Sequence, residues 1–396
     1  MRKPLEGVRV LDLTQAYSGP FCTMNLADHG AEVIKIERPR SGDQTRGWGP
    51  IKNDYSGYYA YINRNKKGIT LDLRSEEGKE IFRELLKTAD VVCENYKVGV
   101  MERLGFSYEE MKKINPRIIY GSISGFGLEG ELAKRPAYDI VAQAMSGMMS
   151  VTGYPDMPPC KIGPSIGDNY SGAYLAMGIL MALYQREKTG EGQRLDVAMM
   201  DTLFSVMENF VVEYTIDGKT PHRAGNQDPS IAPFDSFHAK DGDFVMGCGT
   251  DDMFAKLAGA MGKPELAENP LYKTNYLRCV NYTGLKPIIE EWTGTKTVDE
   301  LEEIIVGLSI PFGNILTIPE AAEHPQTKIR NMLWDVYQPG MNETIRIPGT
   351  PIKMHGQEDK CQKASPQLGE DNESVLKEIL GYSDEKIASL RENGII

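Results

Sequence analysis

The chain has 396 residues, of which 41% are hydrophobic and 25% charged, and this composition is typical of a folded protein with a sizeable core. The length favours two domains over one. The 44 lysines and arginines and the 56 aspartates and glutamates give a net charge of −12, which repels nucleic-acid phosphates and anionic membrane surfaces. A polyanionic ligand must therefore be bound by a local cluster of Arg, Lys and backbone N–H groups.

The N-terminal segment lacks the pattern of a signal peptide, and no apolar run is long enough to span a bilayer. We therefore expect a cytoplasmic protein with no membrane partner and no nucleic-acid partner. The six cysteines lie far apart without a C-x-x-C pair, which indicates reduced thiols. The five histidines show no i,i+4 pairing, so the sequence predicts no metal site.

Short β-branched runs alternate with amphipathic ones through the first half, a pattern typical of a doubly wound α/β sheet. Strands are predicted over residues 8–13, 31–37, 69–73, 91–96, 118–124 and 193–199. Helices are predicted over Phe21–His29, Glu76–Thr88, Tyr170–Lys188 and Asp201–Tyr214. Right-handed crossovers place the carboxyl ends of such strands along one edge, where α/β sheets bind ligands.

The second half of the chain has a different composition. Residues 217–235 are rich in Gly, Pro, Asp and Asn and indicate a linker. A smaller α+β unit is predicted to follow, with strands at 244–249 and 310–316 and helices near 251–261 and 298–306. After Pro319 the pattern indicates a polar, turn-rich stretch and then two short helices, Glu373–Leu380 and Ser383–Glu392, the second with Ser383 as its N-cap.

The turn at residues 14–20 joins the first predicted strand to the first predicted helix. A strand, a glycine turn and a helix start together present free N–H groups to an anion. An ordinary Gly-Pro turn that only starts a helix explains this segment equally well. The turn lacks the G-x-G-x-x-G pattern, so the sequence gives little support to a dinucleotide site.

Basic residues follow or precede the second and third predicted strands, and several should converge on the ligand edge. Such a cluster suits a ligand with two or three phosphates, although each residue alone could belong to a solvated rim. The candidates are Lys35, Arg38, Arg46, Arg64, Lys66, Lys67 and Arg74.

Asp168 stands among glycines directly before the long apolar helix predicted from Tyr170. Capping of that helix would explain an aspartate at this position. A functional carboxylate is the alternative, because the helix field and nearby N–H groups would keep it ionised while Gly167 leaves room for a substrate. The residues alone thus indicate an α/β protein with a phosphate-bearing ligand and a carboxylate near a helix.

A run of segments in one order resembles the class III CoA-transferase family, also called CaiB/BaiF, which includes formyl-CoA, carnitine and bile-acid CoA-transferases. The segments include GVRVLDLTQAYSGP, LADHGAEVIKIERPRSGDQTR, NRNKKGITLDLRSEEGKEIF, ADVVCENYKVGVMERLGFSYE, YDIVAQAMSGMMSVTG, IGDNYSG and LGEDNESVLKEILGYSDEKIASL. The resemblance implies a Rossmann-like large domain formed by residues 1–215 and 325–396, an inserted small domain over 225–320, and an interlocked homodimer.

The resemblance also implies a CoA-transferase that binds no cofactor permanently and uses coenzyme A thioesters and a small carboxylic acid as substrates. Asp168 is the position that matches the aspartate acylated in the family. The implied CoA-contacting residues are Ala16, Tyr17, Arg38, Leu71, Asp72, Asn95, Tyr96, Lys97 and Arg103. Lys97 and Arg103 are expected to flank the adenine and phosphates, because a guanidinium and stem carbons can cover a purine.

The acyl pocket is expected to include Tyr138, Met145, Gly225 and Asn226, with further guesses at Phe234, Phe237, His238, Met246 and Cys248. Backbone N–H groups near Gly167, or in the loops at 225–226 and 247–249, are candidate oxyanion donors. The four glycines that cover the active site of formyl-CoA transferase are replaced here by residues 224–229, which argues against oxalate or formyl specificity. The acid could be short-chain, hydroxy, dicarboxylic or betaine-type.

Three other functions stay open at this point. The α-methylacyl-CoA racemases share the fold but use a His where this chain has Tyr138, and an unperturbed tyrosine is a poor base at neutral pH. A nicotinamide-dependent oxidoreductase would need the missing glycine fingerprint. A CoA-binding protein without catalysis is the third.

Overall fold

The computed structural model describes residues 2–396. The chain divides into two compact units, of which the larger contains the residues up to Met148 together with Lys161–Val211 and Pro325–Ile396. The smaller contains Met149–Cys160 and Val212–His324. The domains predicted from the sequence stay a prediction, and they did not separate residues 149–160 from the large domain.

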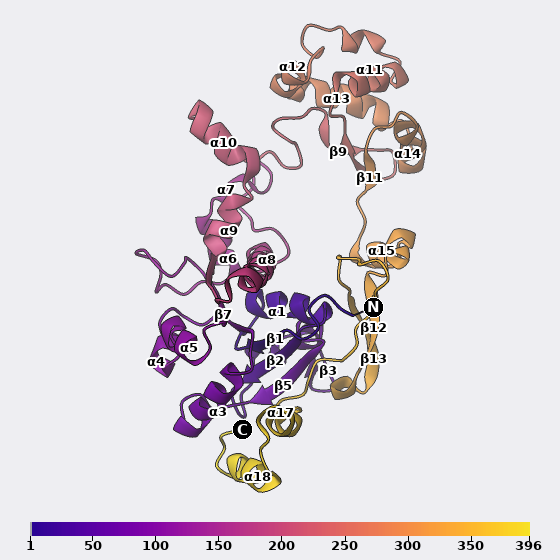
Figure 1. Cartoon of the computed structure of the whole chain (residues 1–396). Helices are drawn as coiled ribbons and strands as arrows, with labels where there is room; N and C mark the ends of the chain where they lie inside the picture. Colours follow the sequence, from indigo (N-terminus) through magenta and orange to yellow (C-terminus); the bar gives the residue numbers. More distant parts are fainter. Residues whose placement is uncertain (1) are drawn as a thin grey trace. The chain divides into compact units, whose positions relative to one another are not determined.

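A parallel six-stranded sheet forms the centre of the larger unit (Figure 1). Its strand order is β5-β2-β1-β6-β7-β8, and all neighbouring strands run parallel. The strands are β1 (Arg9–Asp12), β2 (Glu32–Glu37), β5 (Lys66–Thr70), β6 (Val91–Glu94), β7 (Ile119–Ser124) and β8 (Arg194–Ala198). From β1 the chain continues to β2 and β5 on one side of the sheet, and then to β6, β7 and β8 on the other side. The loops after the neighbouring strands β1 and β6 therefore lead away from each other, and doubly wound sheets bind ligands at such a place.

Helices pack against this sheet, and the strands β1, β2, β6 and β7 are almost wholly buried. Leu11, Ile34 and Val92 pack into a core with Phe82 and Phe106 on one face. The helices are α1 (Ser18–Asp28), α2 (Gly57–Ile62), α3 (Glu76–Leu86), α4 (Val100–Leu104), α5 (Tyr108–Ile114), α6 (Asp139–Met145), α8 (Ile166–Thr189) and α9 (Met199–Ser205). Near the unit boundaries lie α7 (Met148–Val151) and α10 (Glu208–Asp217).

Helices α1 and α8 pack closely against each other. The approach requires a glycine at position 172, because a Cβ there would lie 2.5 Å from the carbonyl oxygen of Ser18. Since Ser18 begins α1 and residue 172 lies in the second turn of α8, this contact brings the starts of the two helices together.

The C-terminal residues return to the sheet beside β5 (Figure 1, yellow). Here α17 (Asn372–Leu380) and α18 (Asp384–Glu392) supply Val375, Leu376 and Leu390 to the same core as β2 and β5. The hydroxyl of Ser383 accepts a hydrogen bond from the backbone N–H of Lys386, which confirms the predicted N-cap. Preceding them are α16 (Pro325–Ile329) and the hairpin of β12 (Leu333–Gln338) and β13 (Glu343–Pro348), which the sequence analysis missed.

The smaller unit is an α+β structure with its own core. An antiparallel sheet in the order β11-β10-β9 packs against helices through Phe237, Phe244, Phe254 and Leu285. Its elements are β9 (Phe234–His238), β10 (Asp243–Gly247), β11 (Phe312–Asn314), α11 (Asp251–Ala260), α12 (Asn275–Val280), α13 (Tyr282–Thr293), α14 (Val298–Gly307) and α15 (Ile318–Glu323). Within residues 2–396, no helix is long and apolar enough to cross a membrane.

Candidate active site

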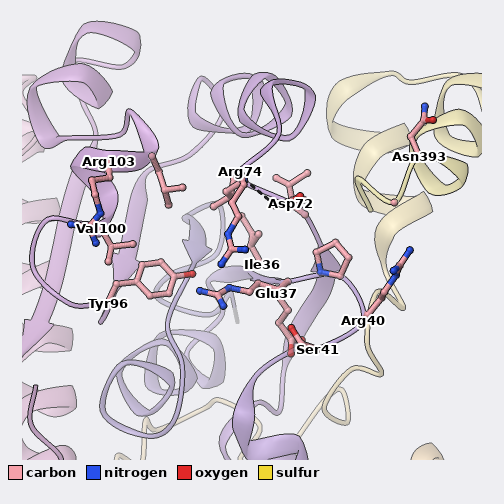
Figure 2. Close-up of a pocket in the computed structure, with 16 residues that line it drawn as sticks. Ile36, Glu37, Arg40, Ser41, Asp72, Arg74, Tyr96, Val100, Arg103 and Asn393 are labelled. Atoms are coloured by element: carbon pink, nitrogen blue, oxygen red, sulfur yellow. Dashed lines mark hydrogen bonds between the residues drawn. The ribbon is translucent and has the colours of Figure 1, made fainter.

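A pocket of about 670 Å³ lies at the carboxyl edge of the parallel sheet, and we call it the arginine pocket (Figure 2). Loops after β2, β5 and β6 form most of its wall, and Asn393 and Gly394, which follow α18, complete it. In Figure 2, Arg103 and Tyr96 lie on one side, Arg40 and Asn393 on the other, and Arg74 between them. The full lining is Ile36–Ser41, Leu71–Arg74, Tyr96, Val100, Arg103, Leu104, Asn393 and Gly394.

Four guanidinium groups of this pocket are exposed and have no carboxylate partner among residues 2–396. They belong to Arg38, Arg40, Arg74 and Arg103. Asp72, also in the lining, accepts a hydrogen bond from the backbone N–H of Arg74 rather than from a guanidinium. The pocket therefore presents several unneutralised positive charges, which suit a ligand with more than one phosphate.

Most of the predicted basic cluster does not reach the pocket, and that part of the prediction is wrong. The side chains of Lys35, Lys66 and Arg64 are almost fully buried beneath the loops, each paired with an aspartate. Charges inside a low-dielectric sheet need such partners, so these cations serve the fold. The other two also have carboxylate partners: Arg46 binds the buried Glu37, and Lys67 binds the half-buried Glu32.

The loop after β1 is fixed in a strained conformation between two polar side chains. Asn95, which follows β6, accepts a hydrogen bond from the N–H of Gln15 at 2.8 Å and donates one to its carbonyl oxygen at 2.7 Å. The next residue, Ala16, has a φ of 60°, a left-handed conformation that costs energy for a residue with a Cβ. Its N–H is held by Asp43 at 3.3 Å.

A second pocket, of about 650 Å³, adjoins the first and contains the side chain of Asp168, so we call it the aspartate pocket. Arg38, Tyr96 and Val100 line both pockets, so these three side chains form their common border. The remaining lining comes from the loops after β1, β6 and β7 and the starts of α6, α8 and α9: Gln15, Ala16, Ser18, Gln44, Asn95, Lys97, Val98, Ile123–Gly125, Ala133–Tyr138, Val141, Asp168 and Met199.

Asp168 lies in the first turn of α8, two residues after the helix begins at Ile166. The expected N-cap role is therefore wrong, because the N-cap is Ser165. The helix start does not hold the pKa of Asp168 low: burial, together with the negative charge of Asp139, raises it to about 7, while the Ser18 hydroxyl opposes the rise. Near neutral pH this carboxyl group is thus divided between its charged and neutral forms.

Aromatic side chains lie near Asp168. The ring of Tyr17 stacks on Phe21 with centroids 5.7 Å apart and lies 5.6 Å from the ring of Tyr58, which meets Trp48 edge-on at 5.4 Å. Burial and the nearby Asp168 charge raise the pKa of both Tyr17 and Tyr58 far above the physiological range, so both stay neutral. Trp48 and Tyr58 were not predicted as site residues.

The comparisons with known proteins agree with this geometry. The family model described as CoA-transferase family III matches residues 5–372. The chain belongs to this family. It is 43% identical to acetyl-CoA:oxalate CoA-transferase of Acetobacter aceti, over 95% of both chains, and 41% identical to succinyl-CoA:mesaconate CoA-transferase of Haloarcula hispanica, over 94% of this chain and 96% of the relative. A solved CAIB/BAIF family protein from Brucella suis superimposes with a TM-score of 0.82, at 38% identity over 96% of this chain and all of that one.

For this family III chain, the structure gathers most of the residues implied as CoA contacts at one edge. Arg38, Leu71, Asp72, Tyr96 and Arg103 line the arginine pocket. Ala16, Asn95 and Lys97 line the aspartate pocket, so Lys97 and Arg103 border different pockets rather than one. Tyr17 lines neither, although its ring lies near Asp168. Their roles in CoA binding stay a prediction.

Only some of the residues expected around the acyl group line the aspartate pocket. Tyr138 lines the aspartate pocket, and Met145 does not. Gly225 and Asn226 belong to the smaller unit, where position 225 packs on the ring of Tyr154.

The guesses at Phe237, Met246 and Cys248 are wrong, because these side chains fill the core of the smaller unit. In β9 buried and exposed residues alternate, so Phe234 and His238 point away from that core.

Several of the proposed oxyanion donors already have partners. The N–H of Gly167 donates to the carboxylate of Asp139 at 2.7 Å. In the smaller unit, the N–H groups of Gly225, Gly247 and Cys248 donate to backbone carbonyl oxygens. These four groups are therefore not available for a reaction intermediate in this conformation.

Proposed function

We propose that this family III enzyme transfers CoA from an acyl-CoA donor to a small dicarboxylic acid through covalent intermediates on Asp168. The observation that carries the proposal is the shared border of the two pockets, where Arg38 and Tyr96 line both. A thioester whose nucleotide occupies the arginine pocket would reach the aspartate pocket with its acyl group. This arrangement suits a long substrate with a phosphorylated end and a reactive end.

The nucleotide of CoA carries a 3′-phosphate and a diphosphate, and the four exposed arginines of the arginine pocket supply matching positive charge. Arginine binds phosphate through two parallel N–H donors, which orient the ligand as well as attract it. Tyr96 adds a half-buried aromatic surface at the same place. We infer that the phosphates lie among Arg38, Arg74 and Arg103.

The reaction begins when the Asp168 carboxylate attacks the carbonyl carbon of the donor thioester. A mixed anhydride forms and CoA leaves as a thiolate. The thiolate then attacks the aspartyl carbonyl carbon, which releases the donor acid and forms an aspartyl-CoA thioester. The acceptor carboxylate attacks that thioester to form a second anhydride and thiolate, and the thiolate finally attacks the acceptor carbonyl carbon, which restores the free Asp168 carboxylate.

The ionised form of Asp168 is the nucleophile, so its protonation sets the pH dependence of the first step. Because burial and Asp139 raise its pKa to about 7, the ionised fraction increases as the pH rises through 7. We expect the rate of Asp168 acylation to increase roughly tenfold between pH 6 and 8 and then to level off. Partial neutralisation also lowers the cost of holding this carboxyl group beside the apolar acyl chain of a substrate.

A dicarboxylic acceptor is supported by two observations. The related enzymes of Acetobacter aceti and Haloarcula hispanica carry the names of oxalate and mesaconate, both dicarboxylic acids. In this chain Lys97, Lys134 and Arg135 line the aspartate pocket. None of the three pairs with a carboxylate among the residues described, so they can bind the second carboxylate of the acid.

We propose that the enzyme acts as an interlocked homodimer. Helix α8 supports association of two chains, because six large apolar side chains on it are 40–68% exposed: Tyr170, Tyr174, Met177, Leu180, Met181 and Tyr184. A stripe of this size on a soluble protein marks an interaction surface. Light scattering should give twice the mass of one chain, and a monomer would contradict the proposal.

The function is tested by mass spectrometry after mixing the enzyme with acetyl-, succinyl- and butyryl-CoA. Hydroxylamine or borohydride traps the acylated aspartate, and peptide mapping locates it. We expect an adduct on the Asp168 peptide that is absent from Asp168→Ala, and acyl transfer to dicarboxylic acids that is lost by at least 1000-fold in the variant. No adduct with any donor, together with deuterium uptake at a substrate α-carbon, would indicate a racemase instead.

A further inference from the structure

The start of α8 is capped by a side chain from another helix. Ser165 occupies the N-cap position but makes no capping hydrogen bond with its side chain. Instead, Oδ1 of Asp139, the first residue of α6, accepts hydrogen bonds from the N–H groups of Gly167 at 2.7 Å and Asp168 at 3.4 Å. The first N–H groups of a helix have no partner within the helix, and here a distant carboxylate supplies one.

A second residue of α6 extends this contact. Gln143, which is fully buried, donates from Nε2 to Oδ2 of Asp139 at 2.6 Å. Its Oε1 accepts a hydrogen bond from the N–H of Ile162 at 2.9 Å. The pair of Asp139 and Gln143 thus binds the backbone both before and after the turn that leads into α8.

Gly167 permits this arrangement because it has no side chain. A Cβ at this position would lie 3.0 Å from Oδ1 of Asp139 and 3.0 Å from Leu203. Any larger residue would push the carboxylate away from the helix start. The glycine before the nucleophile therefore serves the capping contact as well as leaving space near the substrate.

We propose that Asp139 is a positioning residue of the transfer reaction, whose buried carboxylate fixes the backbone of Gly167 and Asp168 and so directs the nucleophile into the aspartate pocket. The inference rests on the proposed function, because it assigns a role only if Asp168 is acylated. Asp139 is 6% exposed, does not line the pocket, and contacts Asp168 only through the backbone. A displacement of about 1 Å at a reacting atom can reduce a rate by two orders of magnitude.

Asp139 also raises the pKa of Asp168 and so lowers its ionised fraction, whereas its positioning effect favours the reaction. The groups that face the Asp168 carboxyl are the Asp139 carboxylate from α6, the Ser18 hydroxyl from α1, and the neutral Tyr17 and Tyr58 side chains. Asp139 is the one negative charge among these groups, and it raises the pKa of Asp168. A variant that keeps the acceptor oxygen but removes the charge can separate the two effects.

The test compares Asp139→Ala and Asp139→Asn with the wild type in the trapping assay, from pH 5.5 to 8.5 at saturating acyl-CoA. Asp139→Ala removes the capping contact, and we expect acylation at the pH plateau to fall about 10- to 100-fold with the donor KM changed less than threefold. Asp139→Asn keeps an acceptor for Gly167, although its amide nitrogen can no longer accept the hydrogen bond from Gln143. We expect it to retain most of the plateau rate, with the pH midpoint about 0.5 to 1 unit lower.

The matched control is Glu109→Gln, which removes a charge from the exposed first turn of α5 and should change neither quantity. Unchanged acylation and an unchanged midpoint in both Asp139 variants would overturn the inference. If Asp139→Ala does not fold, as judged by circular dichroism, Gly167→Ala takes its place, because a Cβ at position 167 would lie 3.0 Å from Oδ1 of Asp139 and displace the cap, and an unchanged plateau rate would then overturn the inference. Absence of an adduct on the wild type would instead overturn the proposed function, and this inference with it.

Discussion

Two sets of basic residues lie within a few residues of each other in sequence and differ completely in environment. Lys35 and Lys66 are within strands β2 and β5 and are fully buried in ion pairs. Arg38 and Arg74 follow the same two strands and are exposed without a carboxylate partner among residues 2–396. The difference teaches that position relative to the strand end, rather than residue type, separates a cation that serves the fold from one that faces a ligand.

The buried set forms a network beneath the start of α1. Lys66 Nζ donates to Oδ2 of Asp12 at 3.0 Å and to Thr23 and Asn63 at 2.8 and 2.9 Å. Lys35 donates to the carbonyl oxygen of Thr14 and to Asp43, both at 2.9 Å. Because every one of these groups is satisfied, the network holds the loop after β1 in place without reaching the pocket.

The largest effect should come from breaking the buried set. Lys66→Met leaves the carboxylate of Asp12 buried without its closest cation, and we expect a loss of roughly 3–5 kcal/mol in the free energy of unfolding. Urea titration followed by circular dichroism measures this loss. A destabilisation as small as that of an exposed lysine would show that Lys66 is not needed to neutralise Asp12.

Glu94, at the end of β6, is a buried carboxylate that has no ion-pair partner among residues 2–396. It accepts hydrogen bonds from the N–H of Tyr96 and the hydroxyl of Tyr120, and burial raises its pKa to about 7. The folded state therefore binds a proton more tightly than the unfolded state, so this group lowers stability as the pH rises from about 4.5 to 7.

Glu94→Gln should remove that dependence. We expect the variant to match the wild type near pH 4.5 and to be more stable by about 1–3 kcal/mol above pH 7, as measured by urea midpoints at both values. Equal stability at pH 8 would mean that Glu94 is ionised in the folded protein without cost. Tyr120 can accept a hydrogen bond from the new amide, but its own hydroxyl, which donates to Glu94 in the wild type, loses that acceptor, and this loss reduces the gain.

The smallest effect on stability should come from the exposed set. Arg74→Ala removes an exposed charge without a carboxylate partner in the described part of the chain, so the unfolding midpoint should stay within error of the wild type. Loss of one guanidinium–phosphate contact should weaken CoA binding about tenfold, most strongly at low salt. Isothermal calorimetry measures this effect, with Arg117→Ala, an exposed arginine outside both pockets, as control. Equal weakening by both variants would contradict a specific site.

The sequence predicted the parallel strands closely, because apolar β-branched runs such as Val91 and Val92 identify strands buried on both faces. It misplaced β5, predicted at 69–73 and observed at Lys66–Thr70, because two lysines were taken for loop residues. No local pattern tells that the side chain of Lys66 turns into the sheet to meet Asp12, which lies 54 residues earlier. Long-range charge pairing of this kind is a property of the fold alone.

The candidate site was predicted in part for similar reasons. The glycine-rich setting singled out Asp168 as a candidate carboxylate and the resemblance to a family added its role, but the helix start was placed near Tyr170 instead of Ile166. The error arose because the residue that caps α8 is Asp139, from a separate helix. A capping partner so distant in sequence has no local signature, so Asp139 could be recognised only in the structure.

The arginine pocket joins residues made at very different times during synthesis. Asp72 and Arg74 are translated early, whereas Asn393 and Gly394 complete the wall, and the N–H of Asp72 donates to the carbonyl oxygen of Ile395 at 2.8 Å. Ribosomes add roughly 5–20 residues per second, so these parts are separated by tens of seconds. A nascent chain that has not yet reached Asn393 and Gly394 therefore lacks part of the wall of the arginine pocket.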